Sequence, residues 1–438
     1  QETYEWQPWK DTIPTYTVPA GADFSDKLIP VNESIGTVYI IKTLLEGGVK
    51  PLACGPTGTG KSVNLQNLLK EKLDQSKYLP VFMSFSAQTS CTMVQNILDN
   101  KFERRRLARD KENTGLDYSV WGPLPGRRAI IYIDDVNMPA REKYGAQPPV
   151  EIVRQALVSD GWYDLKLVRM RLLTEVGMMI SCAPPGGGCN PMSNRFVRHF
   201  NPISFIKLAD ESMEVIFNTI MKDFLSGGFC DDVKEMEGNI VGATIDVYKM
   251  VLDKMRPTPA KSHYLFNLRD ISKVIQGINA AGSKQVGDVT TMLRLWQHEC
   301  ERVFCDRLIN ETDVDLFRLE MCKGTMEKRF GVSFDEVCPS GEPLIWTMYL
   351  KEDRVYEDIP SFKVLKQITE VQLEEFNQEF PTKAMNLVLF SDALAHVTRI
   401  TRVLNTPRGN CLLLGVGGSG RQSVARLASY IMEMEVIM

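Results

Sequence analysis

The stretch that decides the fold is GPTGTGKS, residues 55–62, which follows an apolar run and precedes a helical pattern. It matches GxxxxGK[ST], a loop whose glycines let backbone amides close around phosphate oxygens. In such a loop Lys61 reaches the β and γ phosphates, and the hydroxyl of Ser62 binds Mg²⁺. The strand before it and the helix after it favour a nucleotide-binding loop over a chance glycine-rich turn. The predicted binding residues are Gly55, Pro56, Thr57, Gly58, Thr59, Gly60, Lys61 and Ser62.

Four short apolar runs surround this loop along the chain, at 49–54, 79–85, 129–133 and 176–183. Each is too short for a helix and lacks polar alternation, which is typical of strands buried on both faces of a parallel sheet. Helical patterns lie between them, at 62–73 and 150–158. The alternation predicts an α/β fold, a P-loop parallel-sheet domain over 26–206 that follows an extended arm at 1–25.

The third of these runs, in AIIYIDDVNMP (129–139), ends in two carboxylates. Asp134 is placed to hold Mg²⁺ through water, and Asp135 to orient or deprotonate the water that attacks the phosphate. In most ATPases of this kind the second acid is Glu, which is one methylene longer. A slow or tightly regulated hydrolysis step is therefore predicted. The alternative is an acidic strand end that only caps the following turn.

The fourth run leads into a glycine-rich loop, APPGGGCNP, and then into two arginines. Asn190 is a candidate sensor of the γ-phosphate, and Ser181 at the strand end competes for that role. Arg195 and Arg198 are candidates for stabilising a transferring phosphate across a subunit boundary. The alternative for either arginine is a surface ion pair.

Helical periodicity without strand-like runs predicts a helical lid domain over 207–330. Within it, Arg269 stands near a helix start, where it could fold over a bound nucleotide. The string QHECERV resembles the HExxH zinc motif, but Arg302 replaces the second His, which argues against a metal site. His298 and Glu299 are therefore interpreted as helix-surface or packing residues.

An acidic connector is predicted at 331–385, with TEVQLEEFNQEF as an exposed helix, and a second glycine loop follows. This loop opens the start of a second P-loop α/β domain at 386–438. Arg421 and Gln422 replace the Lys and Ser of the first loop, which predicts phosphate binding without hydrolysis unless Ser423 supplies the hydroxyl. The residues of the second loop are Gly415, Gly417, Gly418, Ser419, Gly420, Arg421, Gln422 and Ser423. The chain starts at Gln1, and EMEVIM at its end resembles an incoming strand, so we expect a piece of a longer protein.

The composition of the chain argues against some classes of binding partner. The chain has 51 Lys plus Arg against 55 Asp plus Glu, a net charge of -4, which argues against nucleic acid or an anionic membrane as partner. The one basic run, FERRRLARDK (102–111), is interpreted as a solvated helix end. No apolar run approaches the ~18 residues of a membrane span. Ten cysteines without a CxxC pair favour a reducing compartment, and the absence of a guanine-selective NKxD string favours ATP or ADP.

Together, six strings resemble the dynein heavy chain family, at its third AAA+ module with the opening part of the fourth, and the axonemal more than the cytoplasmic type. The resemblance covers about 25–438, with Cys189 where Arg is usual and a DD pair in place of Asp-Glu as departures. The strings are GPTGTGKS, YIDDVNMPAREKYGAQPPVEIVRQ, APPGGGCNP with RFVRHFN, LFNLRDISKVIQG, LWQHECERVFCDRL and GVGGSGRQS.

The resemblance implies a ring of six AAA+ modules in which ATP hydrolysis drives movement along microtubules in the ciliary axoneme. The third module would bind ATP or ADP with Mg²⁺ and act as a regulatory gate. Lys61, Ser62 and Asp134 would bind nucleotide and metal, Asp135 would activate water, and Arg269 would act as the lid sensor. Arg195 or Arg198 would contact the neighbouring module's site. The implied partners are the other modules of the heavy chain, microtubules through regions absent here, and dynein intermediate and light chains.

Two rival functions remain open from the sequence. One is a module with permanently bound nucleotide that serves only as a structural element of the ring. The other is a protein-remodelling AAA+ ATPase unrelated to microtubules.

Overall fold

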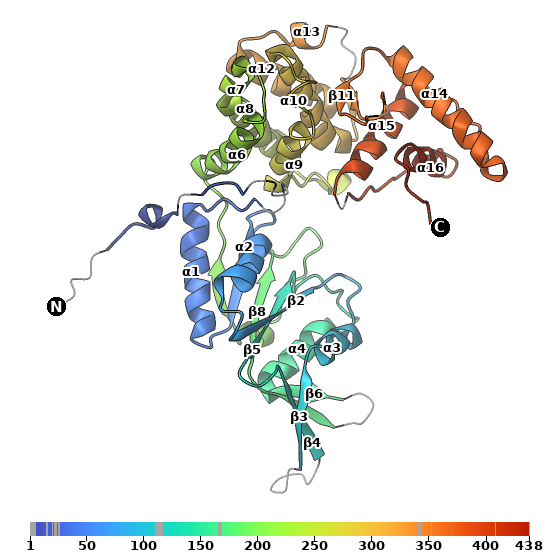
Figure 1. Ribbon diagram of the computed structural model, residues 1–438. Coiled ribbons are helices and arrows are strands. Elements are labelled where there is room, and N and C mark those ends of the chain that lie inside the picture. The colour runs from blue at the N-terminus through green and yellow to red at the C-terminus, as the bar shows by residue number, and fades with distance from the viewer. Residues whose placement is uncertain are drawn as a thin grey trace. The chain divides into compact units, whose positions relative to one another are not determined.

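A five-stranded parallel sheet carries the glycine loop that the sequence singles out (Figure 1). Its strand order is β2-β5-β8-β1-β9. All four predicted strands are confirmed, within one or two residues of their predicted ends, and a fifth joins them at the edge. The strands are β1 (Pro51–Cys54), β2 (Tyr78–Ser84), β5 (Arg128–Asp134), β8 (Val176–Cys182) and β9 (Asn201–Ser204).

The computed structural model describes residues 6–14, 16–19, 21, 24, 27–109, 117–164, 169–339, 344–351, 353–407 and 409–437. The chain divides into two units, Gln1–Ser212 and Met213–Met438, and each has its own apolar core. Part of the predicted arm at 1–25 lies outside the described residues. Its described part includes a 3-10 turn, η1 (Trp9–Thr12).

Both faces of the sheet are buried, as the unbroken apolar runs predict. Along β5, Ile131 and Ile133 contribute to the core cluster on one face, whereas Ile130 and Tyr132 contribute to the cluster on the other. Side chains alternate between faces along a strand, so a strand covered on both sides needs apolar residues at every position. One face is covered by α1 (Asn32–Glu46) and α2 (Lys61–Asn67), and the other by α3 (Cys91–Asp99) and α4 (Pro148–Ser159) (Figure 1).

The predicted helix at 62–73 is confirmed with one change of geometry. It begins as α2 and continues as a π-helical turn, η3 (Leu68–Lys72). Leu65, Leu68 and Leu69 are fully buried along it, and each buried leucine side chain contributes about 1.5–3 kcal/mol. This packing holds the start of α2, and with it the glycine loop, against the sheet.

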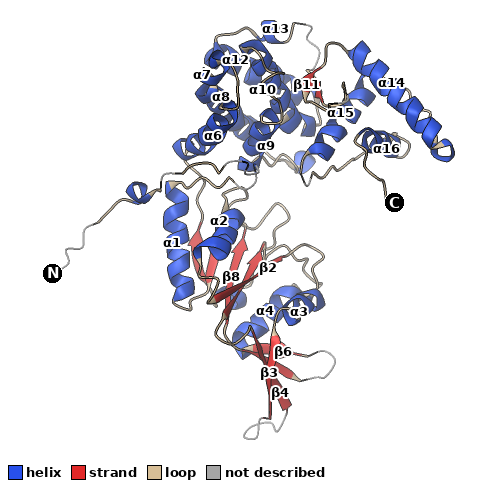
Figure 2. Ribbon diagram, viewed as in Figure 1, coloured by secondary structure: helices blue, strands red, loops and turns tan. Residues whose placement is uncertain are grey.

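A second, four-stranded sheet was not predicted. Its order is β3-β4-β7-β6, and it lies beside α3 and α4 (Figure 2). The interpretation of the basic run as a solvated helix end is wrong, because its described residues form β3, which pairs antiparallel with β4. The strands are β3 (Glu103–Arg109), β4 (Asp117–Gly122), β6 (Gly161–Tyr163) and β7 (Met170–Leu173).

The second unit is helical apart from one short antiparallel pair among its described residues, β10 (Trp346–Thr347) with β11 (Glu357–Asp358). The predicted helical lid forms within it, whereas the start of an α/β domain predicted at 386–438 shows helices and no paired strand among its described residues. None of the described helices combines the length and apolar character that a membrane crossing requires. The helices are α6 (Asp210–Leu225, which starts before the division), α7 (Asp231–Glu235), α8 (Glu237–Lys254), α9 (Leu268–Ile278), α10 (Val289–Val303), α11 (Glu311–Asp315), α12 (Lys323–Phe330), α13 (Phe334–Val337), α14 (Phe362–Glu379), α15 (Ser391–Asn405) and α16 (Arg421–Ile431). They are joined in places by the short turns η4 (Pro259–Lys261), η5 (Cys305–Arg307), η6 (Leu316–Cys322) and η7 (Pro381–Lys383).

The predicted exposed helix forms as α14, but one of its faces is buried. Leu365, Leu373 and Phe376 belong to a core cluster that also contains residues of α15 and α16. The predicted final strand does not form, because the described residues after α16 pair with no other strand.

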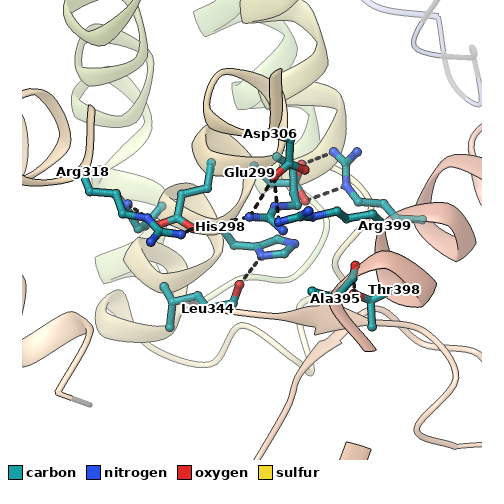
Figure 3. Close-up of polar contacts among 12 residues, drawn as sticks. His298, Glu299, Asp306, Arg318, Leu344, Ala395, Thr398 and Arg399 are labelled. Carbon is teal, nitrogen blue, oxygen red and sulfur yellow. Dashed lines mark hydrogen bonds and ion pairs between the residues drawn. The ribbon is translucent and has the colours of Figure 1, made fainter. Parts of the chain in front are cut away.

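Buried charges cross the second unit between α10 and α15 (Figure 3). Glu299 is 0% exposed, and it accepts hydrogen bonds from Arg402 on α15 and from the Tyr356 hydroxyl at 2.6 Å. Asp306 pairs with Arg302 and with Arg399, each at 3.2 Å. We call these six residues the buried charge network; Glu299 is its fully buried member, whereas Asp306 and Arg399 lie at its partly exposed edge. A buried carboxylate without such partners would be strongly unfavourable. The burial of Glu299 therefore depends on its contacts with Arg402 and Tyr356.

His298, beside Glu299, is also buried rather than on the helix surface. Its Nδ1 donates to the carbonyl oxygen of Leu344 at 2.8 Å, and Nε2 has no hydrogen-bond partner (Figure 3). Burial lowers the pKa of His298 well below its usual value, and Arg302 adds to that effect. Of the two interpretations of this pair left open, surface or packing, the structure shows packing.

Candidate nucleotide-binding site

The first glycine loop has the backbone that phosphate binding requires. It connects β1 to α2, and Gly58 and Gly60 have φ values of 81° and 76°. These left-handed conformations are accessible to glycine without strain. They turn the chain so that α2 begins at Lys61, and the first-turn amides of a helix point outward past its N-terminus, where an anion is favoured.

Gly55 is required for a different reason, which is close approach. A Cβ at this position would lie 2.4 Å from the carbonyl oxygen of Phe205 and 2.9 Å from its Cβ. The Phe205 amide donates to the Cys54 carbonyl at 2.6 Å, which fixes the chain after β9 against the loop. The glycine therefore lets the loop pass close to the segment that follows β9.

Gly55→Ala is expected to lower the free energy of unfolding of the first unit by about 1–3 kcal/mol, because the contact is with backbone that cannot swing away. Thermal or urea unfolding of the purified chain measures this loss. Gly238→Ala, in α8 with no heavy atom within 4 Å of the added carbon, is the control and should be neutral or slightly stabilising. Equal unfolding curves for both variants would contradict the close-approach argument.

The Lys61 side chain lies folded within the loop and is 7% exposed. Its ammonium donates to the carbonyl oxygens of Gly55 at 2.7 Å and Pro56 at 2.6 Å. The Thr59 hydroxyl also donates to Pro56, at 3.0 Å. The positive charge is thus held by backbone oxygens at the mouth of α2.

Asp134 ends β5, and its Oδ1 accepts hydrogen bonds from the hydroxyls of Tyr132, at 3.0 Å, and Ser181. Burial raises the pKa of the Tyr132 phenol, and the charge of Asp134 raises it further, so the hydroxyl stays protonated and donates. The side chain of Ser62 lies near enough to the same phenol to act against this rise in pKa. The predicted Mg²⁺ ligands Ser62 and Asp134 therefore both lie near Tyr132, although they are far apart in sequence.

This donor set fits Mg²⁺, which keeps several waters and needs only one or two protein oxygens beside phosphate. A hydroxyl from the loop and a carboxylate from the strand end are the oxygens that such a site uses. In the described part of the chain no three His, Cys, Asp or Glu side chains are arranged as a metal cage.

Asp135 occupies an unusual backbone position directly after the strand. Its φ is 52°, a left-handed conformation that Asp tolerates better than most residues, and its amide lies 3.4 Å from the Ser181 hydroxyl. Burial raises the pKa of the Cys189 thiol, and the Asp135 carboxylate acts in the same direction. The charge of Asp135 therefore acts on the glycine-rich loop that contains Cys189.

That loop, 183–190, is anchored by Asn137, which sequence reasoning missed. Asn137 is 1% exposed, and its Nδ2 donates to the carbonyl oxygens of Ala183 at 2.9 Å and Asn190 at 3.1 Å. The only signal was an amide residue within DDVN, just past the strand end. Tyr132, the one polar aromatic in an apolar strand, was missed in the same way.

The two candidate γ-phosphate sensors differ in their surroundings. Ser181 is fully buried, and its hydroxyl is shared among Asp134, Tyr132 and the Asp135 amide. Asn190 is half-buried, and its Nδ2 donates to the Pro139 carbonyl at 3.0 Å. The arrangement leaves Asn190 the more accessible of the two.

Three predicted arginines are exposed. Arg195 lies in α5 (Asn194–Val197) with its side chain 69% exposed, 3.9 Å from Glu151, and Arg198 directly follows that helix. Arg269 belongs to the second unit, where its amide donates to the Asn267 side chain at the start of α9. Within the first unit, the described contacts of Arg195 and Arg198 do not include the loop at 55–62.

The second loop repeats the backbone of the first. Gly418 and Gly420 have φ values of 80° and 76°, and α16 begins at Arg421 as α2 begins at Lys61. Arg421 donates to the Val416 carbonyl at 3.2 Å, the counterpart of the bond from Lys61 to Pro56. The residues before the loop form no strand, since no described segment pairs with them.

Comparison with known proteins agrees with this geometry. Family models match residues 16–208 as a "P-loop containing dynein motor region", 240–340 as an "AAA+ lid domain" and 385–438 as a "P-loop containing dynein motor region D4". Dynein axonemal heavy chain 1 of Mus musculus is 39% identical over 445 residues, which cover 98% of this chain and 10% of that protein. Dynein axonemal heavy chain 6 of Homo sapiens is 37% identical over 435 residues, with the same two shares. The chain thus spans about a tenth of the length of these relatives.

Proposed function

The chain belongs to the dynein motor family, and from that premise we propose that its first loop is the ATP-binding site of the third AAA+ module, with the fourth beginning near residue 385. The single observation that carries the proposal is the convergence of the loop, Ser62 and Asp134 at the carboxyl end of the parallel sheet. In open α/β sheets this edge is where ligands bind. The second loop's match to dynein motor region D4 supports the order of the modules.

Each residue has a defined part in this proposal. The loop amides and Lys61 hold the β and γ phosphates, Ser62 and Asp134 bind Mg²⁺, and Tyr132 keeps the two oxygen ligands in position. Mg²⁺, when bound, supplies positive charge against the phosphate oxygens. Asp135 orients or deprotonates the attacking water, and Asn190 contacts the γ-phosphate side.

The exposed arginines complete the site from other surfaces. We assign Arg269 to the lid sensor, and Arg195 or Arg198 to a contact with the site of the neighbouring module. Their exposure supports this assignment, because an arginine that serves another module has to be accessible on its own. Arg421 and Gln422 leave the second loop able to bind phosphate through its backbone but without a hydroxyl for Mg²⁺, unless Ser423 supplies it.

In the whole protein, this module would regulate movement along microtubules in the ciliary axoneme. Its ATP or ADP state would change the contacts between modules, since a ligand shifts a conformation only by binding two states differently. The partners would be the other modules of the heavy chain, microtubules, and intermediate and light chains. The dynein family models favour this role over a protein-remodelling ATPase.

Asp135→Asn in the full-length heavy chain tests the proposed hydrolysis. The variant should bind ATP normally but hydrolyse it about 10²–10⁴-fold more slowly at this module, because a general base contributes that much. Steady-state ATPase activity and microtubule gliding velocity are measured, and both should fall. Glu142→Gln, exposed in the same segment, is the control.

One other function is favoured by a specific observation. The acid at 135 is one methylene shorter than the usual Glu, which suits a module that holds nucleotide structurally without turning it over. Unchanged activity and velocity in Asp135→Asn, with nucleotide still bound, would establish this structural role.

A further inference from the structure

Two cysteines lie side by side where the glycine loop begins. Cys54 is the last residue of β1 and Cys182 the last of β8, and they are register partners in the parallel sheet. Their sulfur atoms are 3.4 Å apart. Cys182 is buried, whereas Cys54 is half-buried and directly precedes Gly55.

The backbone at this pair permits a disulfide. Neighbouring strands lie about 4.7–4.9 Å apart, within the Cα separation of about 4.4–6.8 Å that disulfides adopt. Because the two residues share a register position, both side chains leave the same face of the sheet. The sulfurs have to approach from contact distance to a bond of about 2.05 Å, without any rearrangement of strand order.

We propose that Cys54 and Cys182 form a reversible disulfide that controls nucleotide binding by the adjacent loop. The control rests on the proposed function of that loop, whereas the disulfide itself does not. It is a modification site in an otherwise structural part of the sheet.

The surroundings make Cys54 the reactive member of the pair. Its contact with Cys182 lowers the pKa of the Cys54 thiol to about 7, and the charge of Lys61 acts in the same direction against the effect of burial. The contact raises the pKa of Cys182. At neutral pH a large share of Cys54 is therefore thiolate, the form that reacts with oxidants, while Cys182 stays a thiol.

The oxidant is a peroxide, and the reaction balances in two steps. The Cys54 thiolate attacks one peroxide oxygen, the O–O bond breaks, and Cys54 becomes a sulfenic acid as the other oxygen leaves as water after taking up a proton. The sulfur of Cys182 then attacks the Cys54 sulfur, the S–O bond breaks, and a second water leaves with the thiol proton. Two thiols have lost two electrons to one peroxide, and a dithiol reductant reverses the change.

The bond would act on the loop through its first residue. The Gly55 amide donates to the Cys182 carbonyl at 3.3 Å, and the Gly55 carbonyl accepts from Lys61. Drawing Cys54 toward β8 shifts Gly55 and the oxygen that positions the Lys61 ammonium. Small displacements of groups that hold phosphate are costly, so the oxidised chain should bind nucleotide more weakly.

The first experiment detects the bond. The purified chain is treated with hydrogen peroxide, remaining thiols are alkylated, and the peptides are identified by mass spectrometry with and without dithiothreitol. We expect a Cys54–Cys182 linked peptide that dithiothreitol removes, that is lost in Cys54→Ala and Cys182→Ala, and that persists in Cys230→Ala. Oxidised Cys54 without a linked peptide overturns the proposed pair.

The second experiment measures ADP binding by isothermal titration before and after peroxide. Oxidation should weaken binding by about tenfold or more in the unmodified chain and in Cys230→Ala, and leave Cys54→Ala and Cys182→Ala unchanged. A linked peptide with unchanged affinity overturns the control of binding. If the reduced chain binds no ADP, the proposed function and the control both fail, while the first experiment still decides the disulfide.

Discussion

Lys61→Ala is expected to reduce the affinity of the chain for ATP and ADP by about 100-fold. Hydrogen bonds from a charged donor are worth about 1.5–3 kcal/mol each, and the ammonium is proposed to reach two phosphates. In the structure this charge is held at the mouth of α2 by the carbonyl oxygens of Gly55 and Pro56. Isothermal titration of the purified chain with each nucleotide gives the change.

Two further variants sharpen this test. Lys72→Ala removes an exposed lysine from η3, a few residues along the same helical segment, and should bind nucleotide normally. Lys61→Arg keeps the charge and copies Arg421 of the second loop, so its affinity should fall between those of the unmodified chain and Lys61→Ala. If Lys61→Ala keeps full affinity while its unfolding curve is unchanged, the first loop is not the nucleotide site.

Glu299→Ala should destabilise the second unit by about 3–5 kcal/mol, the second large effect that we expect. The carboxylate is fully buried between Arg402 and Tyr356, and its removal leaves the Arg402 charge in the core without its partner. Hydrogen exchange of the amides in α10 and α15, followed by mass spectrometry, reports the loss within this unit alone. Exchange in both helices should accelerate, while β5 in the first unit stays protected.

A surface pair provides the matched control. Glu320 pairs with Lys254 at 2.9 Å with both side chains exposed, so Glu320→Ala should change stability by less than about 1 kcal/mol. Adding Arg402→Met to Glu299→Ala removes the unpaired charge and should restore part of the lost protection. Equal exchange rates in Glu299→Ala and Glu320→Ala would show that the buried charge network does not hold α10 to α15.

The sequence predicts the main sheet well because burial on both faces leaves a simple mark. The central positions of a strand such as β5 are buried on both faces, and a short apolar run between turn residues is typical of such a strand. The left-handed turns of the first glycine loop are equally predictable, because only glycine adopts these φ values without strain. Asp134 follows because the carboxyl ends of parallel strands meet at one edge.

The second sheet could not be predicted in this way, because β3 has the composition of a solvated segment. The charged segment ERRRLAR forms a strand because it pairs with β4. The sequence of the segment alone does not indicate this pairing. Salt bridges between residues far apart in the sequence are equally hard to predict. Arg171, on β7, pairs with Asp99 and Asp164, residues that nothing in the sequence joins.

The buried charge network was missed for a related reason. A string such as QHECERV is charged enough for a helix surface, and whether Glu299 is buried depends on an arginine about a hundred residues later. Gly277 shows how closely α9 approaches α10, since a Cβ at this glycine would lie 1.8 Å from a side-chain oxygen of Glu299. Likewise, residue type alone predicts neither the left-handed conformation of Asp135 nor the hydrogen bond from Tyr132 to Asp134, because both depend on the neighbouring strands and loops.

The two glycine loops have matching backbones but different side chains. The two loops differ at five of their eight residues, among them Lys61 against Arg421 and Ser62 against Gln422. The left-handed turns at Gly58 and Gly60 nevertheless recur at Gly418 and Gly420. Shape and chemistry are thus encoded at separate positions of one motif. A repeat of this motif can therefore change the side chains that would reach phosphate and metal while the main chain keeps the same course.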